Sequence, residues 1–173
     1  REYKIWHEML QRCYDSKYQE RKPTYKGCGI EGYLLNFQNA AKWIDENYYE
    51  IPGEIMCLDK DILCKRNKVY SRKNCIFVPQ RINTLFIKCD NSRGKTPIGV
   101  SILPSGKYQV HCNNGYGKTI ALGIYSTKEE AFRVYKEYKE KLIKQIADIE
   151  FSKHTISQKC YDAMYNYEIE ITD

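Results

Sequence analysis

The chain has 173 residues, a net charge of +6, 29% charged residues and 42% hydrophobic residues, a composition typical of a soluble globular protein with room for one domain or two small ones. No apolar run approaches the roughly 18 residues that span a bilayer, and no secretory signal precedes the first helix, so we expect a cytoplasmic protein of the host cell interior without a membrane partner. The positive charge favours a polyanionic partner without requiring one.

Two amphipathic helices are predicted in the first fifty residues. Apolar side chains recur at helical spacing in residues 2–14 and again in residues 34–48. Residues 15–33 between them are polar and punctuated by glycine, which predicts a loop or a short irregular strand. Trp6 and Trp43 fall on the apolar stripes, and we expect both in the core.

Residues 57–86 predict a compact ββα unit: a short strand, a basic loop, a second short strand and a helix after Pro79. The first strand carries Asp59 and Asp61, which point to the same face if side chains alternate along it. Such a pair suits joint binding of a divalent cation, and ion pairs with the basic loop are the alternative. The helix presents Asn83, which either contributes to this site or bonds the backbone.

Basic side chains are concentrated around these acids, with ten basic residues against three acidic ones in residues 59–95. The basic residues are Lys60, Lys65, Arg66, Lys68, Arg72, Lys73, Arg81, Lys88, Arg93 and Lys95. A divalent cation together with lysines neutralises phosphate, so the stretch has the composition of a metal-dependent nuclease. It holds no histidine to act as a general base.

The eight cysteines include no CxxC pair, which argues against a zinc ribbon. Cys57 with Cys64 and Cys75 with Cys89 are four conceivable ligands, but free buried thiols in a reducing cytoplasm are the expected state. Most of the sixteen tyrosines are expected to be half-buried packing residues, and some are available to stack on bases or bond phosphates.

The hydrophobic period changes to two after a polar, basic linker at residues 87–97. Three strands separated by turns follow, at residues 98–103, 108–113 and 120–124. Thr127 to Glu130 form a capping box that opens a helix with Tyr135 and Ile146 on its apolar face. This pattern predicts a three-stranded antiparallel sheet packed on one helix.

The predicted fold class is therefore α+β. We expect a helical and ββα module at residues 1–88, a sheet-and-helix domain at residues 95–150, and a C-terminal closing segment at residues 151–173.

The segments IGVSILPSGKYQVHC and IALGIYSTKEEAFRVY resemble the APETALA2 DNA-binding domain. The resemblance implies that the sheet lies in the major groove of DNA while the helix backs it. The face opposite the helix would then carry Ser101, Leu103, Gln109, His111, Asn113, Thr119 and Ala121. Of these, the expected DNA contacts are Gln109, His111 and Asn113. Contacts to phosphate are expected from Arg93, Lys95, Lys107 and Lys118.

The first half resembles phage-encoded HNH endonucleases, which have a ββα-metal fold. The matching segments are YKIWHEMLQRCY, TYKGCGI, FQNAAKWIDEN and LDKDIL…NKVYSRKNCIFVPQRIN. The resemblance implies that Asp59 or Asp61 is the first metal ligand, with Asn83 the ligand on the helix. It also implies that Asn74 is the loop asparagine that orients the general base, and that Lys60 occupies the position of that base. The implied metal is magnesium or manganese.

A lysine in place of the histidine leaves several readings open. Lys60 acts as a base only if its amine is neutral, and two flanking aspartates oppose this. Asp61 could instead deprotonate the attacking water, or Tyr70 or His7 could come in from elsewhere. Lys60 could pair with the scissile phosphate while the cation activates water. In the remaining interpretation the site is inactive, and the ββα unit serves only to bind DNA.

The two resemblances together predict a DNA-binding protein of phage or mobile-element origin, and within that class a metal-dependent endonuclease of HNH or homing type acting on double-stranded DNA. Backbone contacts are expected from Lys65, Arg66, Lys68, Arg72, Lys73 and Arg81. One alternative is a catalytically inactive HNH-like protein that serves as a DNA-binding regulator or as an inhibitor of a host defence system. Another is an interaction protein whose tyrosines and acidic tail bind a protein partner.

Overall fold

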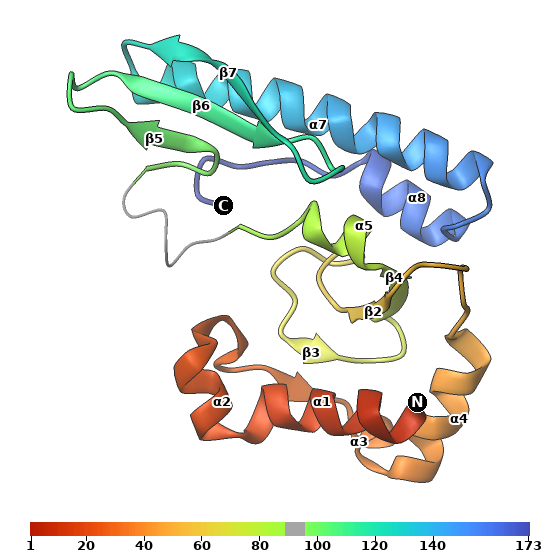
Figure 1. The fold of residues 1–173 in the computed structure, drawn as a ribbon. Coiled ribbons are helices and arrows are strands. Elements are labelled where there is room, and N and C mark those ends of the chain that lie inside the picture. The colour runs from red at the N-terminus through yellow and green to blue at the C-terminus, as the bar shows by residue number, and fades with distance from the viewer. Residues whose placement is uncertain (89–95) are drawn as a thin grey trace. The chain divides into compact units, whose positions relative to one another are not determined.

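The computed structural model describes residues 1–88 and 96–173, and it has the mixed α+β fold class predicted from the sequence (Figure 1). The chain forms two compact units, Arg1–Gln80 and Arg81–Asp173, whose relative positions are not determined. Each unit is therefore considered by itself. Cys89, Arg93 and Lys95, and most of the predicted linker, lie outside the described residues.

The first unit begins with α1 (Glu2–Tyr14), the predicted first helix, which buries Met9 and Cys13. Residues 15–33 hold more structure than the predicted loop. Asp15 accepts a hydrogen bond from the Tyr18 amide and so caps α2 (Ser16–Arg21). The 3₁₀ helix η1 (Pro23–Tyr25) and the short strand β1 (Gly29–Ile30) follow. The prediction missed α2 because polar, charged residues fill it and an N-cap is its main signal.

The second predicted helix is divided in two at Asn36. A short α3 (Gly32–Leu35) precedes it, and α4 (Phe37–Asn47) follows, with the Asn36 side chain accepting from the Asn39 amide as its N-cap. The apolar stripe of α4 buries Ala40, Trp43 and Ile44. Trp43 is thus a core residue, as predicted.

Two strand pairs complete the first unit. β2 (Met56–Asp59) and β4 (Ile76–Pro79) are antiparallel, with Met56 opposite Pro79 and Asp59 opposite Ile76. β3 (Val69–Tyr70) pairs in parallel with β1. The core of the unit joins α1, α4 and these strands through Met9, Leu34, Ile44, Tyr70 and Phe77, all of which are almost fully buried. The long connection between β2 and β4 is thus fastened to the unit at β3.

The second unit begins with α5 (Gln80–Thr84), whose first residue closes the first unit, and continues with a three-stranded antiparallel sheet. The strands β5 (Val100–Ile102), β6 (Tyr108–Asn113) and β7 (Thr119–Tyr125) pair in that order, as predicted. α7 (Lys128–Ser152) runs along one face of the sheet and packs on all three strands (Figure 1). α8 (Gln158–Tyr165) packs on α7.

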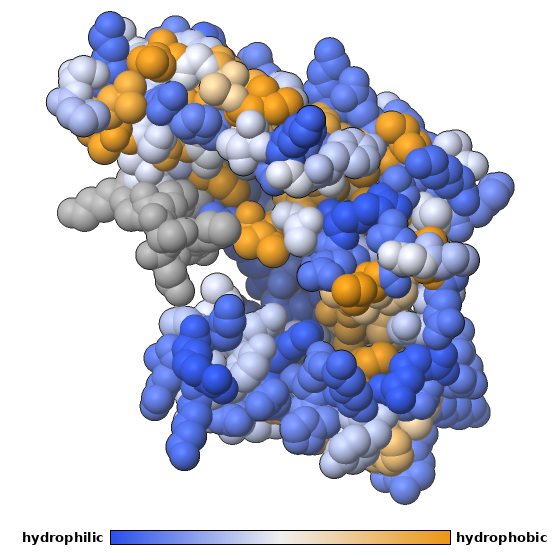
Figure 2. Space-filling view, in the orientation of Figure 1, coloured by the Kyte–Doolittle hydropathy of each residue, from blue (hydrophilic) through white to orange (hydrophobic). Residues whose placement is uncertain are grey.

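A register shift in the sheet changes which residues of β7 lie on the face away from α7, compared with the prediction. Val110 lies opposite Gly123 whereas His111 lies opposite Ala121, so Leu122 is an extra residue on β7. Because the bulge reverses the alternation, Ile124 lies opposite Gln109 on the face away from α7, where 54% of it is exposed. Figure 2 shows hydrophobic residues on the surface over this sheet.

One predicted member of the open face is also displaced. Leu103 lies past the end of β5, in the turn that its amide closes by bonding the Lys107 carbonyl.

None of the helices within residues 1–88 and 96–173 is both long enough and apolar enough to cross a membrane.

Candidate functional site

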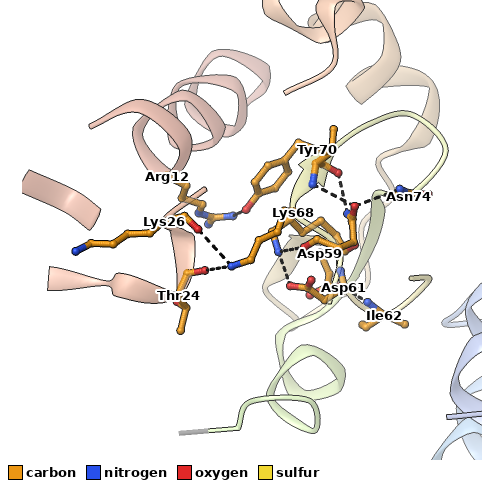
Figure 3. Close-up of polar contacts among 12 residues, drawn as sticks. Arg12, Thr24, Lys26, Asp59, Asp61, Ile62, Lys68, Tyr70 and Asn74 are labelled. Atoms are coloured by element: carbon orange, nitrogen blue, oxygen red, sulfur yellow. Dashed lines mark hydrogen bonds and ion pairs between the residues drawn. The ribbon is translucent and has the colours of Figure 1, made fainter. Parts of the chain in front are cut away.

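The candidate site lies where β2 ends and the basic loop begins. Asp59 is the last residue of β2, and its Oδ1 accepts hydrogen bonds from the backbone amides of Asp61 and Ile62, both at 2.7 Å (Figure 3). The carboxylate therefore closes a tight turn, and Asp61 lies beyond the strand. The expectation that both carboxylates share one face of a strand is wrong, because a side-chain-capped turn replaces the alternation.

Lys60 is a buried cation between these acids. Only 6% of the residue is exposed, and its Nζ donates to Asp61 Oδ2 at 2.6 Å and to the Asn67 carbonyl at 2.8 Å. Nζ also lies 5.9 Å from the centre of the Tyr70 ring. Two of the three N–H donors of the ammonium are thus used inside the loop. Contact of Lys60 with a scissile phosphate and its service as a base stay predictions, and both require a rearrangement of these bonds.

Asn67 is the functional candidate that the sequence analysis missed. Its Nδ2 donates to the carbonyls of Lys60 and Val69, each at 2.8 Å, and its Oδ1 accepts from the Val69 amide at 3.1 Å. The predicted loop asparagine, Asn74, donates to the same Oδ1 at 3.3 Å. Asn74 therefore reaches the base position through Asn67. The available signal was an asparagine two residues before a strand, where its side chain commonly bonds nearby backbone.

The wall behind Lys60 is formed by Tyr70 and Arg12. Tyr70 is 2% exposed, and its hydroxyl accepts from Arg12 Nη1 at 3.4 Å (Figure 3). Burial raises the pKa of Tyr70, although the neighbouring Arg12 opposes this, so the phenol stays protonated at neutral pH. A buried, protonated phenol does not favour Tyr70 as a base. His7 is exposed on α1 and stacks on the ring of Tyr3.

Burial also raises the pKa of Asp59 above its ordinary value, even though the amides of Ile62 and Asp61 favour its ionised form. Asp61 is more accessible, with 46% of its side chain exposed. The two carboxylates thus differ: one is a partly buried turn-forming group, and the other is a half-exposed partner of Lys60.

The basic residues of the loop surround this core at different degrees of exposure. Lys68 is exposed, and its Nζ donates to the carbonyls of Thr24 at 2.9 Å and Lys26 at 3.4 Å (Figure 3). These two hydrogen bonds tie the loop to the η1 segment. Arg72 pairs with Glu31 at 2.6 Å and lies over the ring of Tyr33. Arg66 and Lys73 are exposed, and Lys65 is partly exposed.

Two predicted residues of the site belong to the second unit. Asn83 lies on α5 and is partly exposed, and its position relative to the carboxylates is not determined. Arg81, predicted to contact DNA, forms an ion pair with the buried Glu150 of α7 at 2.5 Å. Arg81 therefore has a role inside its own unit.

The remaining predicted DNA contacts lie on the sheet and its turns. Lys107 and Lys118 are exposed in the two turns, and Gln109 and His111 are partly exposed on the open face. Asn113 is exposed, but its Oδ1 accepts from the Gly115 amide at 2.7 Å and so shapes the β6–β7 turn. The open face itself carries small and polar side chains beside Ile124.

Part of the expected donor set is already engaged in contacts within the protein. One oxygen of Asp59 accepts two amides, and one oxygen of Asp61 accepts the Lys60 ammonium. Within the described part of the chain no three His, Cys, Asp or Glu side chains gather as a metal-binding group. Binding of magnesium or manganese by Asp59, Asp61 and Asn83 stays a prediction.

Comparisons with protein-family models, with curated proteins and with solved structures find no match to this chain.

Proposed function

We propose that this chain is a DNA-binding protein, with an HNH-like site whose strands and loop lie in its first unit and an APETALA2-like sheet in its second. The observation that carries the proposal is the distribution of charge in the loop after β2. Lys65, Arg66 and Lys73 are partly or fully exposed around Asp59 and Asp61. Exposed cations on a rigid loop suit the phosphate backbone, which dominates the affinity of proteins for DNA.

Binding is better supported than cleavage by the contacts of Lys60. An HNH-type reaction needs a base at this position and a cation at the carboxylates. Here one buried ammonium occupies the base position and neutralises Asp61. The loop is therefore held closed by an internal cation, while Arg66 and Lys73 are exposed at its surface. This arrangement favours the inactive HNH-like protein among the alternatives.

Cleavage remains the second candidate because of one observation. The pKa of Asp59 is raised by burial beside a half-exposed carboxylate, and perturbed acids concentrate at catalytic sites. Release of Asp61 by Lys60 would leave two neighbouring carboxylates for a divalent cation, which activates water when bound.

The binding proposal is tested by the salt dependence of affinity for duplex DNA, measured by fluorescence anisotropy. The log–log slope falls by about 0.9 for each phosphate contact that is lost. We expect the triple variant Lys65→Gln, Arg66→Gln, Lys73→Gln to flatten the slope by roughly 2–3 units. The matched control Lys141→Gln, Lys144→Gln, Lys153→Gln removes the same charge from exposed positions on or next to α7.

Equal slopes for the triple variant and its control would contradict the assignment of the loop. Failure of the wild type to bind duplex at low salt would contradict DNA binding itself, and salt-insensitive association with a protein would favour the interaction-protein alternative.

Cleavage is tested in the same samples with supercoiled plasmid and magnesium or manganese. The binding-only proposal expects intact plasmid with the wild type. Metal-dependent cutting that disappears in Asp59→Ala, Asp61→Ala would instead establish the second candidate. The variant Lys60→His restores the histidine of the family pattern and shows whether the lysine alone prevents cutting.

A further inference from the structure

The segment that forms the three-stranded sheet carries positive charge and no negative charge. Between Asp90 and Glu129 the sequence has basic residues but no acidic one. Lys107 and Lys118 are exposed in the two turns that flank β6. A sheet that is bordered by cations and free of carboxylates is complementary in charge to a polyanion such as DNA.

Gln109 of β6 and Ile124 of β7 lie opposite each other on the open face, away from α7. The His111 amide donates to the Gly99 carbonyl at 2.9 Å, on the side of β6 that pairs with β5. Because the direction of hydrogen bonding alternates along a strand, the backbone of Gln109 also bonds β5. Gln109 and Ile124 are therefore a non-hydrogen-bonded pair, the kind whose Cα atoms lie about 4.5 Å apart and whose side chains are closest.

Both side chains of this pair are available to a ligand. Ile124 is 54% exposed, and Gln109 is partly exposed. The amide group of Gln109 forms no hydrogen bond with any residue in the described part of the chain. Asn113 differs, because its Oδ1 already accepts from the Gly115 amide. The open face thus presents an unengaged side-chain amide directly beside an exposed aliphatic side chain.

The polar atoms of Gln109 match adenine better than the other bases. A side-chain amide has one acceptor oxygen and one donor NH₂ group. In the major groove adenine presents an acceptor, N7, beside a donor, the N6 amino group. Guanine presents two acceptors there, cytosine a donor and thymine an acceptor. Adenine is therefore the base that engages both ends of the amide at once.

Ile124 adds a preference for the base that pairs with adenine. The C5-methyl group of thymine is the apolar group in the major groove, and apolar side chains contact it. In an A·T pair this methyl group shares the major-groove edge with N6 and N7 of adenine. A cross-strand neighbour of Gln109 is thus placed to contact the methyl group while the amide bonds adenine.

We propose, on the basis of the DNA binding proposed above, that Gln109 and Ile124 together read an A·T pair in the major groove. The Gln109 amide bonds N6 and N7 of adenine, and Ile124 packs on the methyl group of thymine. In this arrangement Lys107 and Lys118 hold phosphates without regard to sequence, and the pair supplies the discrimination between bases.

The assignment is tested with the full chain by fluorescence anisotropy, without divalent metal and at one low salt concentration. The probes are alternating dA·dT, dA·dU, dI·dC and dG·dC duplexes of equal length. Uracil lacks the methyl group of thymine, and an I·C pair combines the major groove of G·C with the minor groove of A·T. We expect dA·dT to bind roughly 5–150-fold more tightly than dG·dC and dI·dC, and about fourfold more tightly than dA·dU.

Two variants assign these differences to the two side chains. Ile124→Ala should bind dA·dT and dA·dU equally, and Gln109→Ala should lose most of the preference over dG·dC. The matched controls should keep the wild-type pattern: Ile102→Ala changes an isoleucine of β5 that is 60% exposed, and Gln145→Ala changes an exposed glutamine of α7. The comparison of dA·dT with dA·dU uses the unchanged protein, so it does not depend on the folding of a variant.

Equal affinity of the wild type for all of these duplexes would overturn the proposal and leave DNA binding intact. The same conclusion would follow from a preference that survives both Gln109→Ala and Ile124→Ala, or from one that dI·dC shares with dA·dT, since the latter reports the minor groove. Failure to bind any of the duplexes would overturn the assignment together with DNA binding itself.

Discussion

At the scale of single residues, Lys60 has the largest effect on how the first unit can act. Its ammonium joins the side chain of Asp61 to the backbone of Asn67 across the loop. An adjacent lysine and aspartate could be read as an ion pair from the sequence. The burial of Lys60 could not, because it depends on Tyr70 and Asn67, which come from a later part of the loop.

Replacing Lys60 with methionine should destabilise the first unit by about 1–3 kcal/mol, because a hydrogen bond to a charged group is lost and the partly buried Asn67 carbonyl loses a donor. Urea unfolding would measure the change. Lys42→Met is the control, since Lys42 is exposed on α4. Equal stability of the two variants would show that the Lys60 contacts contribute little.

Asp59→Asn should stabilise the protein at neutral pH. Burial raises the pKa of Asp59 above that of an unfolded aspartate, so ionisation costs stability above the folded pKa. The cost falls as the pH drops through the folded pKa, and it is absent below the unfolded value near 3.8. Asparagine keeps the acceptor for both amides without this cost.

Thermal unfolding as a function of pH would test that expectation. The melting temperature of Asp59→Asn should exceed that of the wild type by a few degrees at pH 7, and the difference should shrink on acidification. Glu46→Gln, exposed on α4, controls for the loss of a negative charge. A difference that grows as the pH falls would contradict the raised pKa.

At the scale of elements, hydrophobic period and capping chemistry located the second unit well. Alternation predicted all three strands, and the Thr127 capping box predicted the start of α7, where Thr127 Oγ1 accepts from the Glu130 amide. The position of Ile124 was not predictable in this way, because the bulge at Leu122, where the register shifts between Val110 and His111, is set by pairing between strands. Asn36 similarly ends one helix and starts the next inside a continuous apolar pattern.

Gly99 provides a test of how the sheet docks on α7. Its φ of +74° already disfavours any side chain, and a Cβ there would lie 2.0 Å from the buried Tyr135 ring. Gly99→Ala should therefore cost roughly 2–4 kcal/mol, from backbone strain and overpacking together. Gly106→Ala has nearly the same φ, +78°, but its Cβ meets nothing within 4 Å, so only the strain of about 1–2 kcal/mol remains.

Chemical denaturation of the two glycine variants in parallel isolates the contact with Tyr135. Equal losses of stability would mean that the ring moves aside and that Gly99 matters only for its backbone conformation.

At the scale of the whole molecule, the chain divides at Gln80, inside the segment that the sequence groups as one ββα unit. The strands β2 and β4 and the helix α5 all form as predicted. The order of elements along the sequence nevertheless does not show in which of the two cores a short helix packs. The buried Ile82 of α5 and the Arg81–Glu150 pair place it with the second unit.

The buried cysteines can report on the unfolding of each unit separately. Cys13, Cys28 and Cys75 are buried in the first unit, whereas Cys112 and Cys160 are buried in the second. Burial raises the pKa of Cys13 to about 11 and that of Cys75 to about 12, so these thiols should react only after unfolding. Exposed Cys64 should react in the native state.

Pulsed thiol labelling across a urea series, read by peptide mass spectrometry, should give one midpoint for the cysteines of each unit, since each unit has its own core. Different midpoints for Cys13 and Cys75 would show that the first unit does not unfold cooperatively.

The contact between Lys60 and Asp61 also bears on where the charge at this site comes from. A metal centre draws its cation from the surroundings, so its integrity varies with supply, with competing chelators and with the compartment that the protein enters. Here the positive charge is synthesised with the chain and sits one residue from the acid it neutralises. This contact thus does not depend on a supply of metal, and chelating agents such as EDTA should leave it unchanged.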